Sequence, residues 1–316
     1  MIGVVALNPA LDVTHHVDSV DWAGVNRPVS VRAVPGGKGL NVARILHALG
    51  PDVVLMGLAG GNTGAAVRSG LQAAGVTAVF TQIAADTRRT FVVVDTSRAS
   101  VASFYEPGAP VTTEEFGRFL ASYRETLPGC GAVVLSGSLP PGLAAGTYAD
   151  LTAMAAGAGI PVILDTSGEA LLRGAAAGPA IIKPNLAELA AATGRDLRWA
   201  DPRDQQAVLS AAAGLRERGA QAVVVSLGER GLLAVTPEGA WHATPEPVPG
   251  NPTGAGDAAV AGLAHGLTLG TSWPERLRHA AALGSAAAAA ATAGEFGPAD
   301  YRLALRNMRV RPLEQV

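Results

Sequence analysis

The residues best suited to chemistry lie in the run NPTGAGD, residues 251–257, directly before an apolar stretch with helical periodicity. Gly254, Ala255 and Gly256 allow a tight turn, and a helix that begins there presents free N–H groups and a partial positive charge to an anion. Asp257 then lies in the first turn and faces the same opening. A carboxylate beside a phosphate-binding helix end is suited to act as general base for a hydroxyl that attacks a phosphoryl group. The alternative is an ordinary loop in which Asp257 caps the helix.

A second glycine-rich turn, PGGKGLNVARIL, covers residues 35–46 and also precedes a helix pattern. This helix start combines three groups that suit an anion or a polyol: a backbone that a ligand can approach closely at Gly37, the cation of Lys38 and the amide of Asn41. The alternative is a glycine-rich turn with a solvated lysine. The chain lacks the P-loop spacing G-x-x-x-x-G-K-[ST], and no G-x-G-x-x-G follows its first strand, so a dinucleotide fold has little support.

Two further stretches offer hydrogen-bonding and charged groups. Asp12 closes the run NPALD, residues 8–12, after the first predicted strand, where it can accept hydrogen bonds from sugar hydroxyls. Arg88 and Arg89 begin a strand-like stretch and have the geometry to grip a phosphate with two parallel bonds. A turn-forming aspartate and surface arginines are the alternatives.

Short apolar, β-branched runs alternate with helical patterns along most of the chain, which predicts a mostly parallel sheet covered on both faces. The predicted strands are residues 3–7, 53–58, 132–135, 162–165, 180–182 and 222–226. The predicted helices are residues 39–49, 63–74, 113–126, 145–158, 186–193, 205–218 and 257–267, and residues 272–293 read as two packed helices. Polar runs follow successive strands at 136–142, 165–171, 183–189 and 226–231, and this recurrence favours a functional site at the carboxyl edge of the sheet.

Two stretches break this alternation. Residues 13–34 and 90–105 look like amphipathic strands, and no helix pattern interrupts either of them. They predict a small β layer beside the main sheet. An exposed apolar β face of this kind covers a ligand or pairs with another subunit.

Composition bounds the class of protein. The chain has 316 residues, of which 48% are hydrophobic and 16% charged, with a formal net charge of −2, so it supplies a sizeable core and no basic patch for nucleic acid. Cys130 is the one cysteine, which excludes an internal disulfide or a cysteine-rich zinc site. The N-terminus lacks the features of a signal peptide, and the apolar run 286–291 is far shorter than the about 20 residues of a membrane span. A cytoplasmic protein without a membrane partner is expected.

The Gly-Gly pair, the KPN-x-x-E pattern and the GAGD run, in this order, resemble those of the ribokinase-like, or PfkB, carbohydrate kinases, and the resemblance runs from about residue 8 to residue 267. NPALD, GGKGLNVAR, SGSLPPG and KPNLAEL are most similar to the 1-phosphofructokinase and tagatose-6-phosphate kinase group. The resemblance implies an α/β fold of three layers, α/β/α, with a mostly parallel central sheet. It implies a single kinase domain over residues 1–316, with a β lid from about 13–34 and 88–106 that also serves as a homodimer contact.

The resemblance also implies a role for each candidate residue. Asp257 takes the proton from the acceptor hydroxyl, and the amides of Ala255, Gly256 and Asp257, after the turn at Gly254, hold the transferring phosphoryl group. The residues implied to hold the sugar are Asp12, Gly37, Lys38 and Asn41, and those implied to hold its phosphate are Arg88, Ser138 and Arg27. The residues implied on the ATP side are Lys183, Asn185, Ser226 and Gly228, with Glu188 placing Mg²⁺ through water.

The implied activity is ATP-dependent phosphorylation of a hexose phosphate, with fructose 1-phosphate giving fructose 1,6-bisphosphate. Tagatose 6-phosphate and fructose 6-phosphate stay open as acceptors. A non-catalytic sugar-phosphate sensor on the same fold is a remote alternative, because Asp257, Gly254 and Gly256 are all present. A nicotinamide-dependent enzyme lacks its fingerprint.

Overall fold

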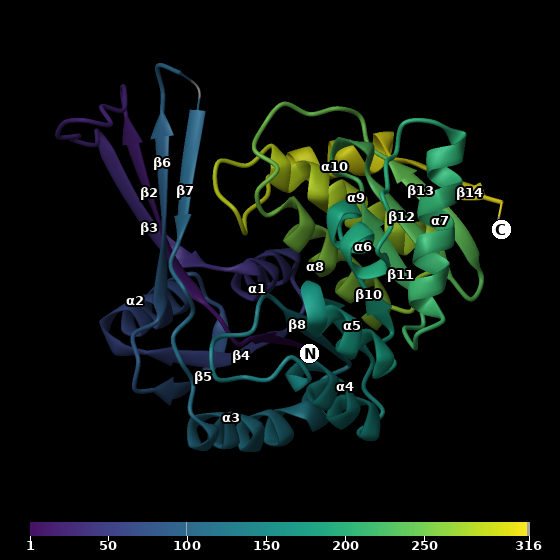
Figure 1. Ribbon diagram of the computed structural model, residues 1–316, viewed down its shortest axis with the longest axis horizontal. Coiled ribbons are helices and arrows are strands. Elements are labelled where there is room, and N and C mark those ends of the chain that lie inside the picture. The colour runs from purple at the N-terminus through teal and green to yellow at the C-terminus, as the bar shows by residue number, and fades with distance from the viewer. Residues whose placement is uncertain (99, 315–316) are drawn as a thin grey trace.

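The computed structural model describes residues 1–98 and 100–314 and contains one large sheet (Figure 1). Its strand order is β14-β13-β12-β11-β10-β9-β8-β1-β4-β5, with parallel pairing from β5 to β11 and antiparallel pairing from β11 to β14. The strands are β1 (Ile2–Ala6), β4 (Val53–Gly60), β5 (Thr77–Ile83), β8 (Ala132–Ser136), β9 (Val162–Asp165), β10 (Ile181–Ile182), β11 (Val223–Ser226), β12 (Leu232–Thr236), β13 (Gly239–Thr244) and β14 (Arg309–Leu313).

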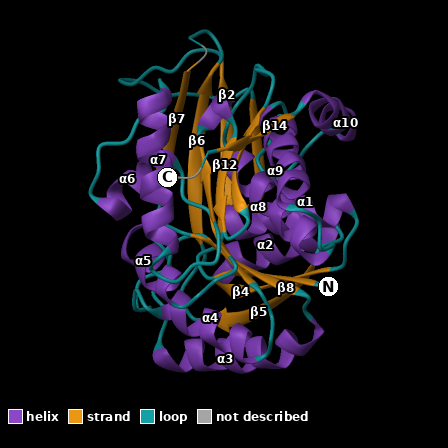
Figure 2. Ribbon diagram, turned by 90° about the vertical axis from the view of Figure 1, so that its right-hand side faces the viewer, coloured by secondary structure: helices purple, strands orange, loops and turns teal. Residues whose placement is uncertain are grey.

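Each face of this sheet carries its own hydrophobic core, because alternate residues of a strand point to opposite faces. In β8, for example, Val133 and Leu135 join one core and Val134 joins the other. One face is covered by α3 (Thr113–Thr126), α4 (Thr147–Gly157), α5 (Gly168–Ala176), α6 (Leu186–Thr193) and α7 (Pro202–Arg216). The other is covered by α1 (Lys38–Leu49), α2 (Gly61–Ala73), α8 (Ala255–Thr268), α9 (Trp273–Ala288) and α10 (Pro298–Asn307). The predicted three layers are confirmed (Figure 2).

A second sheet stands beside the first, with the order β3-β2-β6-β7 (Figure 1). It consists of β2 (Ala10–Val17), β3 (Ser30–Gly36), β6 (Arg88–Asp95) and β7 (Ser100–Tyr105), and we call it the small sheet. It forms from two segments that lack helix patterns and are rich in β-branched residues, and the small β layer predicted from the sequence is confirmed. One of its faces carries Asp12 and Thr90, which are paired across β2 and β6, and the opposite face carries Val13 and Phe91.

The structure differs from the sequence prediction at several elements. Strands β5, β12, β13 and β14 and helices α5 and α10 were not predicted. Residues 272–293 were expected to form two helices, but they hold one, α9. Gly284 lies inside this helix and does not end it. A Cβ atom at Gly284 would come within 3.2 Å of the Ala255 carbonyl oxygen, so the glycine allows close packing against the start of α8.

Helices α8 and α9 pack very closely, because small residues line their contact. A Cβ atom on Gly262 would come within 2.6 Å of the Ala280 Cα atom, so the two backbones touch at this point. Helix α8 also packs against α1. The start of α8 is therefore held by main-chain contacts on one side and by α1 on another.

The order of the strands defines where a ligand can enter. From β1 the chain continues to β4 and β5 on one side, whereas β8, β9, β10 and β11 follow in turn on the other side. The side on which successive strands are added thus switches between β1 and β8, and in open parallel sheets ligands bind at the carboxyl ends of the strands beside such a point. Asn8, Ser136, Asp165 and Lys183 all lie at or just beyond the carboxyl ends of these strands.

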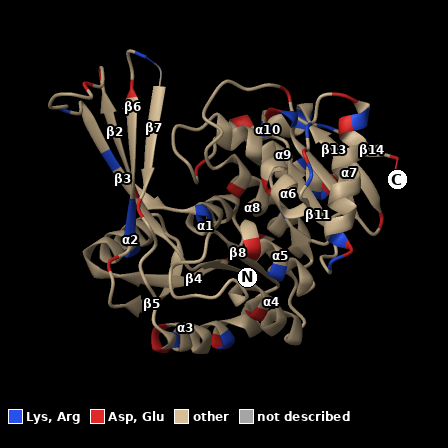
Figure 3. Cartoon of the chain, viewed as in Figure 1, with Lys and Arg blue, Asp and Glu red and all other residues tan. Residues whose placement is uncertain are grey.

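Charges of both signs are interspersed over the surface helices, for example on α3 and α7, in keeping with the near-neutral net charge (Figure 3). Among the described residues, no helix combines the length and the apolar character needed to cross a membrane.

Candidate active site

A cavity of about 1240 Å³ opens at the carboxyl edge of the main sheet, between that sheet, the small sheet and the starts of α1 and α8. The candidate residues named from the sequence line it, with the exceptions of Arg27 and Arg89. The predicted sites for a sugar, a nucleotide and a base therefore belong to one cleft. The cleft lies at the carboxyl edge, at the switch point of the strand order.

Arg27 was predicted to help hold the phosphate of the sugar, but in the structure it is exposed and does not line the cavity. Strands β2 and β3 pair from Ala10 with Gly36 to His16 with Ser30, so residues 18–29 emerge at the outer end of the small sheet. Asp12, which does line the cavity, lies near the inner end of β2. The length of these two strands carries Arg27 away from the cleft of its own chain.

The GAGD run forms the start of α8, the helix start for which an anion site was predicted. Gly254 caps the helix with a φ of +86°, a left-handed conformation that favours glycine. The Ala255 amide donates to the Pro252 carbonyl oxygen at 3.1 Å, so this amide, predicted to hold the phosphoryl group, is engaged within the turn. No described side chain caps the helix start, which leaves the amides of Gly256 and Asp257 for an anion.

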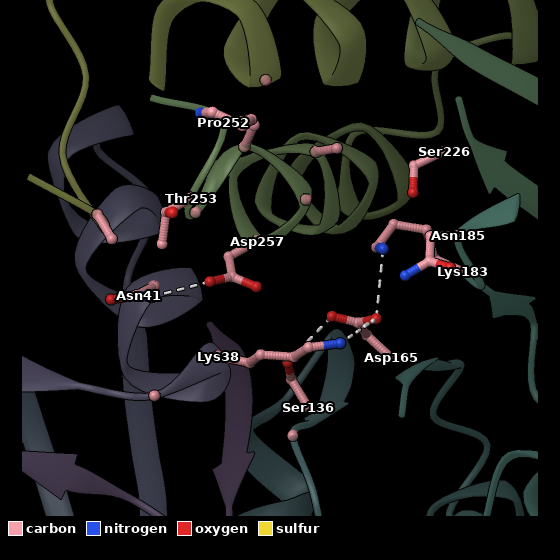
Figure 4. Close-up of a pocket in the computed structure, with 18 of the residues that line it drawn as sticks. Lys38, Asn41, Ser136, Asp165, Lys183, Asn185, Ser226, Pro252, Thr253 and Asp257 are labelled. Atoms are coloured by element: carbon pink, nitrogen blue, oxygen red, sulfur yellow. Dashed lines mark hydrogen bonds and ion pairs between the residues drawn. The ribbon is translucent and has the colours of Figure 1, made fainter. Parts of the chain in front are cut away.

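Asp257 is almost fully buried in the first turn of α8, and one carboxylate oxygen accepts a hydrogen bond from Asn41 Nδ2 at 2.8 Å (Figure 4). Burial and the nearby Asp165 charge raise the pKa of Asp257 to about 7, against the opposing effects of Asn41, Lys38 and Lys183. Asp257 is therefore a carboxylate that exchanges its proton near neutral pH. Asn41, predicted as a sugar ligand, here holds the carboxylate of Asp257.

The sequence prediction gave no role to Asp165, the last residue of β9. Its carboxylate lies 3.3 Å from Lys38 Nζ and 3.3 Å from Lys183 Nζ, and Ser136 Oγ donates to it at 3.5 Å (Figure 4). Burial works against the charged form, but Lys183 and Lys38 together hold the pKa of Asp165 below its ordinary value. Asp165, and to a lesser degree Glu188 and Asp257, outweigh the effect of burial on Lys38 and raise its pKa. Lys38 thus stays charged beside Asp257, and Lys183 lies on the same carboxylate of Asp165.

The KPN-x-x-E pattern builds the start of α6. Asn185 Oδ1 accepts from the Glu188 amide and Glu188 Oε2 accepts from the Asn185 amide, each at 2.8 Å, which is a capping box. The second oxygen, Glu188 Oε1, lies 3.8 Å from Lys38 Nζ. The motif therefore fixes the helix and leaves one carboxylate oxygen on the cavity side.

Away from Lys183 and Asp165, the cavity is lined by residues of the small sheet and of the loops that follow β1 and β8. Thr90 Oγ1 donates to Asp12 Oδ1 at 2.7 Å, Asn8 Nδ2 donates to Ser138 Oγ at 2.9 Å, and the Arg88 guanidinium lies 3.4 Å from the Asn8 carbonyl oxygen through both Nε and Nη2. Burial lowers the pKa of Arg88 from a value so high that the side chain stays charged. This end offers a cation, a hydroxyl and a carboxylate to one ligand.

The residues that line the cavity fit a nucleoside triphosphate. Lys38 and Lys183 supply fixed positive charge, and the start of α8 supplies unpaired amides. Among the described residues no group of three or more His, Cys, Asp and Glu side chains could hold a metal. Mg²⁺ commonly binds through phosphate oxygens, water and one or two carboxylates, so Glu188 Oε1, which faces the cavity 3.8 Å from Lys38 Nζ, fits that mode.

Comparison with known proteins agrees with this geometry. The model of the pfkB family of carbohydrate kinases matches residues 6–299. A 1-phosphofructokinase of Rhodobacter capsulatus is 38% identical over 94% of this chain and 92% of its own length. An ATP-dependent 6-phosphofructokinase isozyme 2 of Mycobacterium tuberculosis is also 38% identical, over 90% of this chain and 81% of its own.

Among solved structures, phosphofructokinase-2 from Escherichia coli superposes with a TM-score of 0.88 and 32% identity, covering 96% of this chain and 98% of that one. Another structure of the same enzyme is of its tetrameric inhibited form. Fold and site thus define a sugar kinase, of the class that uses ATP with Mg²⁺. The chain belongs to the pfkB family of carbohydrate kinases, which confirms the resemblance inferred from its motifs.

Proposed function

We propose that the protein transfers the terminal phosphoryl group of ATP to fructose 1-phosphate and releases fructose 1,6-bisphosphate and ADP. The observation that carries the proposal is the buried carboxylate of Asp257, with a pKa of about 7, in the same cavity as a free helix start and two lysines. The 1-phosphofructokinase that matches nearly the whole chain supports this acceptor. Fructose 6-phosphate is the second candidate, because a 6-phosphofructokinase matches at the same identity.

Asp257 is the general base of this reaction. It takes the proton of the acceptor hydroxyl as the oxygen bonds to phosphorus, and the bond from phosphorus to the ADP oxygen breaks. The amides of Gly256 and Asp257, at the positive end of α8, bind the negative charge of the phosphoryl oxygens in transit. Lys38 and Lys183 neutralise further charge, and Asn41 keeps the Asp257 carboxylate oriented.

The two ends of the cavity divide the substrates. Asp12, Gly37 and Lys38 hold the sugar, while Arg88 and Ser138 hold the phosphate that it already carries. The nucleotide side is formed by Lys183, Asn185, Ser226 and Gly228, with Glu188 holding Mg²⁺ through water. Lysine and arginine at opposite ends of the cleft match a substrate pair that carries phosphate at both ends.

The test of this function is a coupled ADP-release assay with a panel of acceptors. The panel contains fructose 1-phosphate, fructose 6-phosphate, tagatose 6-phosphate, fructose and ribose. We expect the highest kcat/KM for fructose 1-phosphate. Turnover of free sugars alone would overturn the hexose-phosphate subclass, and binding of a hexose phosphate without any turnover would support the sensor alternative.

The pKa of Asp257 predicts the pH dependence of the reaction. Only the deprotonated carboxylate accepts a proton, so kcat/KM should fall as the pH drops through about 7. Replacing Asn41 with Leu removes a hydrogen bond that favours the charged form, so this limb should move to higher pH. A pH profile of kcat/KM for both proteins measures the shift. A wild-type limb near the ordinary value of 3.8 would contradict the raised pKa of Asp257, and a limb that Asn41→Leu leaves in place would show that Asp257 is not the titrating base.

We also propose that residues 1–316 act as one kinase domain, that the small sheet closes over the sugar as a lid, and that its outer face pairs two chains. Val31 and Phe104 lie on the face turned away from Asp12, and they are 56% and 53% exposed. An exposed apolar sheet face of this kind is typical of an interface. The tetrameric form of the Escherichia coli enzyme supports assembly of this fold.

The variant Val31→Asp should convert the dimer to a monomer, because it would bury a charge in the apolar contact without a partner. Sedimentation velocity at several protein concentrations measures the change. The matched control is Leu303→Asp, on α10, since Leu303 is 59% exposed and lies outside the small sheet. A wild-type monomer at all concentrations, or a Val31→Asp dimer as stable as the control, would contradict the proposed contact.

A further inference from the structure

Asn8 connects the two side chains that are proposed to hold the acceptor's phosphate. It follows β1 at the carboxyl edge of the main sheet, lines the cavity and has no role in the function described so far. Its side-chain amide donates to Ser138 Oγ at 2.9 Å. Its main-chain carbonyl oxygen lies 3.4 Å from both Nε and Nη2 of Arg88. Ser138 follows β8 and Arg88 begins β6, so Asn8 joins groups from both sheets.

The direction of the Asn8 hydrogen bond matters for what Ser138 can offer. A serine hydroxyl has one hydrogen and two lone pairs, and here a lone pair accepts the Asn8 amide hydrogen. The hydroxyl hydrogen is therefore free to be donated to a ligand. A dianionic phosphate only accepts hydrogen bonds, so a Ser138 hydroxyl set as a donor beside the Arg88 cation matches it.

The Asn8 side chain also lies against Gly108, in the segment that follows β7. A Cβ atom on Gly108 would come within 2.7 Å of Asn8 Oδ1, so the segment after β7 lies directly against the amide. Gly108, Glu106 and Tyr105 line the same cavity. The amide of Asn8 thus lies between the segment after the small sheet and Ser138, with little room to turn.

We propose that Asn8 is the positioning residue of the phosphate-binding end of the cavity. Its side chain sets Ser138 as a hydrogen-bond donor and its carbonyl oxygen aligns the Arg88 guanidinium, so that both grip the phosphate of the acceptor. The inference rests on the proposed function, since it assumes an acceptor that already carries phosphate. It assigns Asn8 to the acceptor alone, and not to the nucleotide.

The decisive variant is Asn8→Asp, which keeps the shape and reverses the hydrogen-bonding character. An aspartate only accepts, so it would draw the Ser138 hydrogen to itself and bring a negative charge next to the phosphate. We expect KM for the hexose phosphate to rise about 30-fold, while KM for ATP changes less than about twofold, as for a charge-assisted hydrogen bond. Asn8→Ala, which only removes the donor, should raise KM for the hexose phosphate about fivefold.

A double-mutant cycle separates positioning from a direct contact. If Asn8 acts through Ser138, then Asn8→Ala should have little further effect in a Ser138→Ala background. The matched control is Asn62→Asp, because Asn62 is exposed in the first turn of α2 and lies outside the cavity. Thermal unfolding of each variant shows whether the fold is intact, and the KM for ATP provides an internal check.

Calorimetric titration of fructose 1-phosphate and fructose 6-phosphate, without nucleotide, keeps the two proposals distinguishable. Weaker binding by Asn8→Asp supports the role of Asn8 even if the wild type fails to turn over either sugar, in which case only the proposed function fails. Unchanged binding by Asn8→Asp, an equal rise of KM for ATP, or additive effects of Asn8→Ala and Ser138→Ala would overturn the role of Asn8 and leave the proposed function standing.

Discussion

Replacing Asp257 with Asn should lower kcat about a thousandfold, with little change in KM for either substrate. The asparagine keeps the size of the side chain and its contact with Asn41, but it cannot take the proton of the acceptor hydroxyl. The helix start and both lysines remain in place, so binding should survive the loss of chemistry. Steady-state kinetics with the preferred acceptor, together with calorimetric binding of that acceptor, measure the two effects separately.

The stability of the Asp257→Asn variant provides an independent check. The pKa of Asp257 in the folded protein, about 7, lies above its ordinary value of 3.8, so this group stabilises the fold at low pH and loses that contribution as the pH rises through about 7. The variant should therefore become more stable than the wild type at pH 8, by roughly 2–4 kcal/mol, and this gain should shrink towards pH 4. Asp150→Asn, on an exposed position of α4, is the control. Full activity in Asp257→Asn would contradict the assignment of the base.

Replacing Asp165 with Asn should reduce kcat about a hundredfold and lower the free energy of unfolding by about 3 kcal/mol. The reason is that Asp165 is the shared partner of Lys38 and Lys183, and Lys183 is almost fully buried. Without the carboxylate, the two cations lose the group that lies 3.3 Å from each of them. Urea unfolding and steady-state kinetics measure the two losses.

The exposed Asp196→Asn is the matched control for Asp165, since its side chain is 83% exposed and pairs only with a surface arginine. Because the pKa of Asp165 in the folded protein lies below its ordinary value, the wild type loses this stabilisation as acid protonates Asp165, so the difference from Asp165→Asn should be present at neutral pH and shrink at low pH. A variant with wild-type stability and wild-type kcat would show that the two lysines are held by other groups.

The start of α8 was predictable because its signals are local. Gly254 and Gly256 bracket one residue before a helical pattern, and Asp257 falls in the first turn by counting alone. The small sheet was predictable for a similar reason, since alternation of apolar and polar residues marks a strand without reference to distant partners. The capping box of Asn185 and Glu188 likewise lies within one turn.

Asp165 was missed because its importance depends on distance in space. Lys38 is 127 residues away along the chain, and only the order of the strands brings the two together. Arg27 was misplaced for a related reason, because the number of paired residues in β2 and β3 decides where the connecting segment emerges. Asn41 was expected to contact the sugar, but the packing of α1 against α8 turns its amide to Asp257.

The close contact of α8 with α9 has a consequence for the chemistry at the helix start. At Gly262 the two helices touch backbone to backbone, which leaves little room for one helix to slide past the other. The amides of Gly256 and Asp257 are therefore held in one orientation before a substrate binds, and in the proposed reaction they need not turn when charge builds up on the phosphoryl group. A helix dipole of this kind is preorganised, which means that its orientation was fixed when the protein folded. In the proposed reaction it lowers the barrier to phosphoryl transfer because no free energy is spent on turning the amides in the transition state.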